Sequence, residues 1–98
     1  MVEELLKPGE RINQLFSTDI KIIQNREVFS YSVDSVLLSR FPRFPKNGLI
    51  VDFCAGNGAV GLFASSRTKA KILSVEIQER LADMADRSVR LNGLEEQM

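Results

Sequence analysis

A short apolar run that leads into a glycine-rich turn constrains the fold of this chain more than any other feature. Residues 49–53, Leu-Ile-Val-Asp-Phe, are typical of a strand buried on both faces, and a tight turn follows at residues 54–58. Apolar residues within 59–66 predict a helix, and residues 72–77 predict a second buried strand. Strand, helix and strand within about 30 residues indicate a right-handed βαβ unit with a parallel sheet.

The segments on either side carry weaker patterns. The helical spacing of Ile12, Leu15 and Phe16 predicts one short helix in an N-terminal arm. Two β-prone runs, residues 20–23 and 28–31, predict a hairpin.

Two further helices are expected. The first begins at Ser32 or Asp34, runs through Arg40 and ends before Pro42. Its expected apolar face comprises Val33, Val36, Leu37 and Phe41. The second carries Leu81, Met84, Ala85, Ser88 and Val89 at helical spacing and ends at Asn92-Gly93.

We therefore predict an α/β chain in two parts. Residues 1–47 would form an arm, hairpin and helix that pack on the core. Residues 48–98 would form the first β-α-β-α portion of a Rossmann-like domain, an incomplete version of that fold.

Composition excludes several classes of function. A chain of 98 residues with 44% hydrophobic content can bury one modest core. Thirteen basic and thirteen acidic residues give no global charge for a nucleic acid or an anionic membrane. The single Cys54 and the absence of His leave too few ligands for a usual zinc site, so we expect no metal. No apolar run approaches the roughly 20 residues of a membrane span, and we expect a cytoplasmic protein.

The glycine-rich turn and a later carboxylate form the candidate site. Gly56-x-Gly58-x-x-Gly61 follows a strand and opens a helix, and Glu76 lies at the end of the next strand. Glycines allow a ligand to approach the backbone, and a carboxylate at that strand end can bind ribose hydroxyls. Nicotinamide dinucleotides and S-adenosylmethionine both fit this spacing.

Asp52, at the end of the first strand, favours S-adenosylmethionine over a nicotinamide dinucleotide. A carboxylate about 6 Å from a phosphate costs a few kcal/mol at an effective dielectric near 20. S-adenosylmethionine has no phosphate but carries an ammonium and a sulfonium, which Asp52 would attract directly or through water.

The same residues resemble a known family. Residues 51–58, Val-Asp-Phe-Cys-Ala-Gly-Asn-Gly, resemble motif I of class I S-adenosylmethionine-dependent methyltransferases, and Val75-Glu76-Ile77 is similar to their ribose-binding strand end. Residues 29–38 and 76–85 resemble bacterial tRNA (adenine-N6) methyltransferases that modify valine tRNA. The resemblance runs from about residue 10 to residue 97.

The resemblance implies S-adenosylmethionine as cofactor and tRNA as partner. The residues expected at the cofactor are Asp52, Cys54, Gly56, Gly58, Glu76, Ile77, Tyr31 and Asp34. We also expect Ile77 in the core. Asn57 is expected to be a left-handed turn residue.

The chain departs from the family in two places. Cys54 stands where motif I often has glycine. The family's Asn-Pro-Pro-aromatic motif, which orients and stacks the target adenine, does not occur, so we expect no catalytic residue in this chain. We expect it to be part of a longer enzyme, inactive alone, and to self-associate through an unpaired edge of residues 49–53.

Other interpretations remain open. The chain could be the dinucleotide-binding half of an oxidoreductase or a non-catalytic binding module of the same fold. Asp52 could simply cap the next helix, and Glu76 could be a solvated charge. Six basic residues could contact tRNA or could be solvated: Arg40, Arg43, Lys46, Arg67, Lys69 and Lys71.

Overall fold

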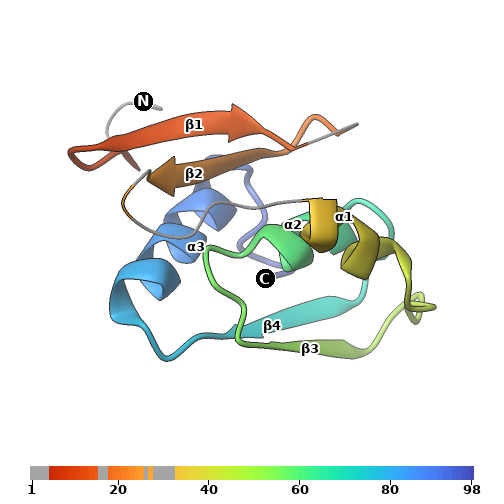
Figure 1. The fold of residues 1–98 in the computed structure, drawn as a ribbon. Helices are drawn as coiled ribbons and strands as arrows, with labels where there is room; N and C mark the ends of the chain where they lie inside the picture. Colours follow the sequence, from red (N-terminus) through yellow and green to blue (C-terminus); the bar gives the residue numbers. More distant parts are fainter. Residues whose placement is uncertain (1–4, 16–17, 26, 28–32) are drawn as a thin grey trace.

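Two small sheets and three helices make up the fold (Figure 1). The computed structural model describes residues 5–15, 18–25, 27 and 33–98. The strands are β1 (Glu10–Gln14), β2 (Lys21–Asn25), β3 (Leu49–Phe53) and β4 (Lys71–Val75), and the helices are α1 (Val33–Arg40), α2 (Ala59–Ser65) and α3 (Glu79–Leu91). β1 and β2 form an antiparallel hairpin, and β3 and β4 form a parallel pair.

The parallel pair confirms the predicted βαβ arrangement and a small α/β fold. Val51 lies opposite Leu73 and Asp52 opposite Ser74, so both strands end at the same edge of the sheet. α2 packs closely on β4, since a Cβ placed at Gly61 would lie 3.2 Å from the Ser74 Oγ. The glycine at this position therefore permits close helix–strand packing.

The N-terminal hairpin differs from the prediction. Residues 10–14 form strand β1 instead of a short helix, and they pair with β2. Residues 28–31, the predicted second strand, lie outside the described residues. Because side chains alternate along a strand, Glu10 and Ile12 both lie on the side of β1 that contacts α3. These tertiary contacts favour a strand here, although the spacing of the apolar residues is helical.

The predicted burial of β3 and β4 on both faces is wrong. Ile72 is buried toward the helices, but Leu49, Val51 and Leu73 are exposed on the opposite face. Ile77, expected in the core, is 97% exposed. All three helices lie on one side of the β3–β4 pair, so the other side has no covering layer among the described elements (Figure 1).

α1 covers the predicted range but buries a different face. Val36, Ser35 and Ser39 are buried, whereas Leu37 and Phe41 are exposed. The face of α1 that packs on α2 is therefore partly polar. The prediction that Leu37 and Phe41 belong to the apolar face is wrong.

α3 agrees closely with its prediction. Its buried stripe contains all five predicted residues, Leu81, Met84, Ala85, Ser88 and Val89. The Ser88 hydroxyl accepts a hydrogen bond from the Ile23 N–H at 2.9 Å, which ties α3 to β2. The helix ends at Leu91 with Asn92 as its C-cap, and Gly93 has a positive φ of 67°, as expected for a C-terminal stop. In the ranges that the structure describes, no helix has the length and apolar character of a membrane span.

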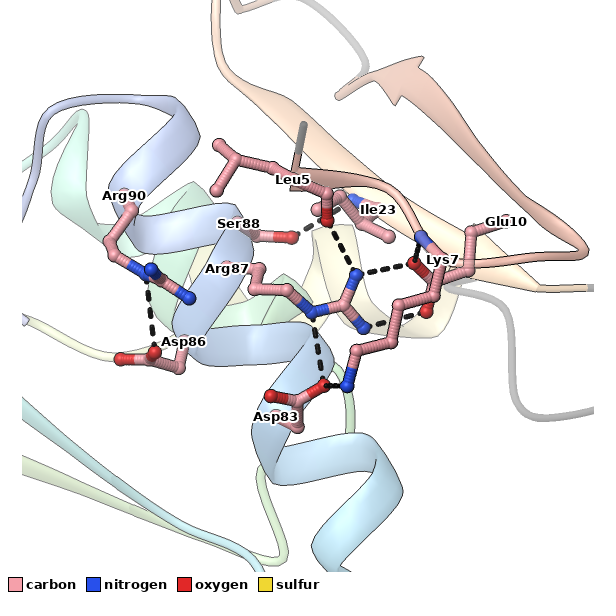
Figure 2. Close-up of polar contacts among 9 residues, drawn as sticks. All are labelled: Leu5, Lys7, Glu10, Ile23, Asp83, Asp86, Arg87, Ser88 and Arg90. Atoms are coloured by element: carbon pink, nitrogen blue, oxygen red, sulfur yellow. Dashed lines mark hydrogen bonds and ion pairs between the residues drawn. The ribbon is translucent and has the colours of Figure 1, made fainter. Parts of the chain in front are cut away.

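A buried ion pair joins the hairpin to α3 (Figure 2). The Arg87 guanidinium donates to both carboxylate oxygens of Glu10, one of them at 2.7 Å, and the two side chains are only 5% and 3% exposed. Arg87 also donates to the Leu5 carbonyl at 2.7 Å and to Asp83 at 3.0 Å, and Lys7 donates to the same Asp83 oxygen at 2.8 Å. Arg87 lowers the pKa of Glu10, mainly through this hydrogen bond.

Removing one member of this pair should destabilise the fold. Arg87→Met leaves the Glu10 carboxylate buried without its partner, and we expect a loss of about 3 kcal/mol in the free energy of unfolding. Urea unfolding followed by circular dichroism measures this loss. The matched control is Arg90→Met, because the Arg90–Asp86 pair is exposed and should contribute under about 0.5 kcal/mol. A Glu10→Leu/Arg87→Met double variant should recover most of the loss, and no recovery would contradict the ion-pair explanation.

Candidate functional site

The loop at residues 54–58 is held by its own backbone. The Ala55 N–H donates to the Val75 carbonyl at 2.9 Å, and the Gly58 N–H donates to the Ala55 carbonyl at 3.0 Å. Gly56 and Gly58 have positive φ values of 60° and 90°, which only glycine adopts without strain. These contacts hold the loop against the end of β4.

Cys54 adopts a left-handed backbone conformation in this loop, which the sequence did not predict. Its φ is +59°, and among the described residues it is the only non-glycine with a positive φ. The prediction that Asn57 would be the left-handed residue is wrong, because Asn57 is fully buried and does not have a positive φ. A glycine at position 54, which the resembled family often has, would adopt this conformation at lower cost.

Glu76 bridges the loop and the start of α3. One carboxylate oxygen accepts the Gly56 N–H at 2.7 Å, and the other accepts the Gln78 N–H at 2.9 Å. These hydrogen bonds, that from Gln78 first, lower the pKa of Glu76 and keep it ionised at neutral pH. A carboxylate has about four acceptor positions, so Glu76 can still accept a hydrogen bond from a ligand.

Asp52 contributes a second carboxylate to the same region. Its Oδ2 atom is buried and has no hydrogen-bond partner in the structure. Burial, and then repulsion from the Glu76 carboxylate, raises the pKa of Asp52. The ionised form of Asp52 is therefore destabilised, and a nearby positive charge would stabilise it.

Two hollows flank the loop. One, of about 320 Å³, lies between α1, the loop and the start of α3, and the other, of about 170 Å³, lies between β4 and α3. Ala55, Gly56 and Glu76 line both. Among the described residues, neither lining contains Lys or Arg. Glu76 contributes a carboxylate to both hollows, and Asp86, which pairs with Arg90, contributes one to the smaller hollow. Glu76 therefore gives the region a local negative charge.

Some of the expected cofactor residues gather at these hollows. Cys54, Gly56 and Glu76 line the larger hollow. Asp34 is exposed and lies in neither lining, but its neighbour Ser35 lines the larger one. Tyr31 lies outside the described residues.

The other expected residues lie at the margin of the site. Gly58 packs inward, since a Cβ there would meet the Ala85 Cβ at 3.1 Å. Asp52 and Ile77 are absent from both linings.

Sequence reasoning missed several polar groups at this site. Ser35 and Gln78 line the larger hollow. Asn57 is 0% exposed, and neither its amide nitrogen nor its oxygen has a hydrogen-bond partner. The Ser74 Oγ is also buried without a partner. No sequence pattern marks these residues, because their burial depends on how α1, α2 and α3 pack.

Comparison with known proteins gives no further assignment: no family model matches the chain, and no curated protein matches it. In the part of the chain that the structure describes, no cluster of His, Cys, Asp or Glu could hold a metal ion.

The strained backbone at Cys54 yields a stability prediction. Cys54→Gly removes the left-handed strain, and we expect a gain of about 1 kcal/mol in the free energy of unfolding. Cys54→Val, whose branched side chain is poorly tolerated at positive φ, should lose a similar amount. Thermal unfolding compares the two variants, and a loss for the glycine variant would show that the cysteine side chain stabilises the loop.

The raised pKa of Asp52 yields a pH prediction. The Asp52 carboxyl binds its proton more tightly in the folded state than in the unfolded state. Its contribution to the free energy of unfolding therefore falls as the pH rises from the ordinary pKa of 3.8 through the raised pKa. Asp52→Asn should therefore stabilise the ligand-free chain at pH 7 and flatten this part of the pH dependence. Thermal unfolding between pH 3.5 and 7 tests this, with Asp19→Asn, at an exposed position, as the control. A destabilised Asp52→Asn chain at pH 7 would contradict the prediction.

Proposed function

We propose that this chain binds S-adenosylmethionine at the edge where β3 and β4 end and forms the cofactor-binding part of a methyltransferase. The observation that carries the proposal is a glycine-rich loop held by the Glu76 carboxylate, with no basic side chain among the described residues that line its two hollows. Such a site favours a cationic ligand over an anionic one.

The backbone of the loop also argues against a dinucleotide. Phosphate-binding loops present free N–H groups to the ligand. Here the Gly56 N–H donates to Glu76, and those of Ala55 and Gly58 donate to backbone carbonyls. A pyrophosphate would have to displace the Glu76 carboxylate and then lie close to Asp52.

The residues present fit S-adenosylmethionine. The Glu76 carboxylate can accept hydrogen bonds from ribose hydroxyls, and the larger hollow falls within the usual range of ligand sites, about 300–1,000 Å³. The unpartnered Asp52 carboxylate provides a negative field for the sulfonium and ammonium groups. When bound, the cofactor supplies an electrophilic methyl group.

The proposed acceptor is the adenine N6 amino group of a tRNA. This part of the proposal rests on the resemblance of residues 29–38 and 76–85 to the tRNA (adenine-N6) methyltransferases. The residues of this chain would bind and orient the cofactor, and we assign no catalytic residue among them.

Calorimetric titration with three ligands tests the proposal. We expect S-adenosylmethionine and S-adenosylhomocysteine to bind and NADH not to bind. Glu76→Gln should weaken both adenosyl ligands at least about tenfold, because charged hydrogen bonds to ribose contribute about 1.5–3 kcal/mol each. Asp52→Asn should weaken S-adenosylmethionine more than the neutral thioether S-adenosylhomocysteine.

Glu79→Gln is the matched control, since this exposed carboxylate lies at the start of α3 outside both hollows. It should leave all affinities unchanged. Binding of NADH, or Glu76→Gln affinities within threefold of the unmodified chain, would count against the proposed cofactor. Binding of none of the three ligands would favour a non-catalytic module.

A further inference from the structure

Basic side chains are concentrated in the middle of the chain. Residues 35–75 contain six Lys or Arg residues and a single acidic residue, Asp52, whereas the rest of the chain contains seven basic and twelve acidic residues. The zero net charge of the whole chain therefore conceals a middle segment with a formal charge of +5. Asp52 lies near the carboxyl end of β3, and the basic residues of the segment lie toward the opposite end of the strands.

Two loops bring these basic residues to one edge of the β3–β4 pair. The α1–β3 connection, residues 41–48, and the α2–β4 connection, residues 66–70, both lead into the amino ends of the strands (Figure 1). The candidate cofactor site lies at the carboxyl ends, and strands of five residues separate the two edges by roughly 15 Å. We define the basic surface as five exposed side chains on or beside these loops: Arg40, Arg43, Lys46, Arg67 and Lys69.

Side-chain contacts hold the two loops together. The Thr68 hydroxyl donates to the Pro45 carbonyl, and the Arg67 guanidinium donates to the Ser39 carbonyl at 2.6 Å. Arg67 also lies over the Phe44 ring, 5.3 Å from the ring centroid. The basic surface is therefore one continuous surface, although its residues come from two segments of the sequence.

A hollow of about 460 Å³ lies between the loops, and no described carboxylate lines it. Its lining consists of three cations and three hydroxyl side chains: Lys46, Arg67, Lys69, Ser65, Ser66 and Thr68. The three hydroxyl groups donate to backbone carbonyls, so the cations are the groups available to a ligand. Cations that converge on a hollow favour a phosphate group, which accepts charge-assisted hydrogen bonds from several donors.

No described carboxylate neutralises the basic surface. None of its members forms an ion pair with an Asp or Glu among the described residues. The sixth basic residue of the segment, Lys71, differs, because its Nζ donates to the Glu96 carbonyl at 2.6 Å, where the Glu95 and Glu96 side chains are exposed. We therefore leave Lys71 outside the basic surface.

A three-residue repeat places an exposed aromatic ring among the cations. Residues 40–46 read Arg-Phe-Pro-Arg-Phe-Pro-Lys, and a residue before proline disfavours helical geometry. The two rings have different surroundings, because Phe44 packs beneath Arg67 whereas Phe41 is 87% exposed. Proteins that bind single-stranded nucleic acids combine a basic groove with exposed rings on which bases stack.

We propose that the basic surface binds a single-stranded nucleic acid, with backbone phosphates at Lys46, Arg67 and Lys69 and a base stacked on Phe41. An anionic membrane is a poorer partner, because the cations surround a hollow that a flat bilayer does not enter. The basic surface lies at the edge away from the candidate cofactor site. The proposal therefore depends on neither the cofactor nor methyl transfer.

Fluorescence anisotropy of a labelled, unstructured RNA of about 12 nucleotides, titrated with the 98-residue chain at about 25–200 mM KCl, tests the proposal. We expect binding that weakens as the salt concentration rises. Lys46→Gln/Lys69→Gln should weaken binding at least about tenfold. It should also reduce the slope of log affinity against log salt by about 1.4, because each phosphate contact on a single strand contributes about 0.7.

Phe41→Ala separates base stacking from charge. It should weaken RNA binding at least about fivefold and leave the salt slope unchanged, since the ring carries no charge. DNA of the same sequence should behave similarly, because both strands offer phosphates and bases. A duplex that binds as tightly as the single strand, with no effect of Phe41→Ala, would contradict the single-stranded assignment.

Lys21→Gln/Arg90→Gln is the matched control, because it removes the same charge from exposed side chains on β2 and α3. It should bind RNA like the unmodified chain, and an equal loss in both double variants would show that only net charge matters. The proposal is also wrong if neither RNA nor DNA binds at about 100 μM chain and low salt. It is equally wrong if vesicles that contain phosphatidylserine bind more tightly than the strands.

Circular dichroism establishes that each variant is folded, and Arg43→Gln/Lys69→Gln replaces the first double variant if that variant is not. Glu76→Gln, at the opposite edge of the strands, should leave RNA affinity unchanged. Titrations with adenosyl ligands remain a separate measurement, so failure of this proposal and failure of the proposed cofactor are distinguishable.

Discussion

The ion pair between Arg87 and Glu10 joins the two halves of this small protein. An isolated two-stranded hairpin is at best marginally stable in water, and β1–β2 is such a hairpin. Arg87 holds it on α3 through Glu10 and the Leu5 carbonyl, while Ser88, one residue later, accepts the Ile23 N–H. Apolar packing of Ile23 against Leu81 and Met84 completes this contact. α3 therefore contacts the hairpin along its buried face, and its first residues adjoin the candidate site.

At the candidate site, two carboxylates differ in how well the ligand-free fold accommodates them. Glu76 fixes the loop by accepting two backbone N–H groups, and it retains acceptor positions for a ligand. Asp52 has no such compensation, because its buried oxygen lacks a partner and its pKa is raised. A buried polar group that weakens the ligand-free fold is common where function requires it. Asp52 thus has a physical reason to attract a cation.

The exposed apolar face of the β3–β4 pair and the candidate site adjoin at the carboxyl ends of the two strands. Phe53 and Ile77 are strongly exposed, and they flank the loop and Glu76 in sequence.

The sequence by itself determined the elements whose signals are local: the β3–α2–β4 unit, the extent of α1, and α3 with its buried stripe. It also predicted that Glu76 and the glycine-rich loop lie together, because their spacing follows from strand and turn geometry. Tertiary structure alone decided that residues 10–14 form a strand, since Glu10 and Ile12 gain their partners from α3. It also decided that Ile77 is exposed and that the Asp52 Oδ2 atom and the Asn57 side chain are buried without hydrogen-bond partners. Burial depends on which layers pack together, and no local pattern encodes that.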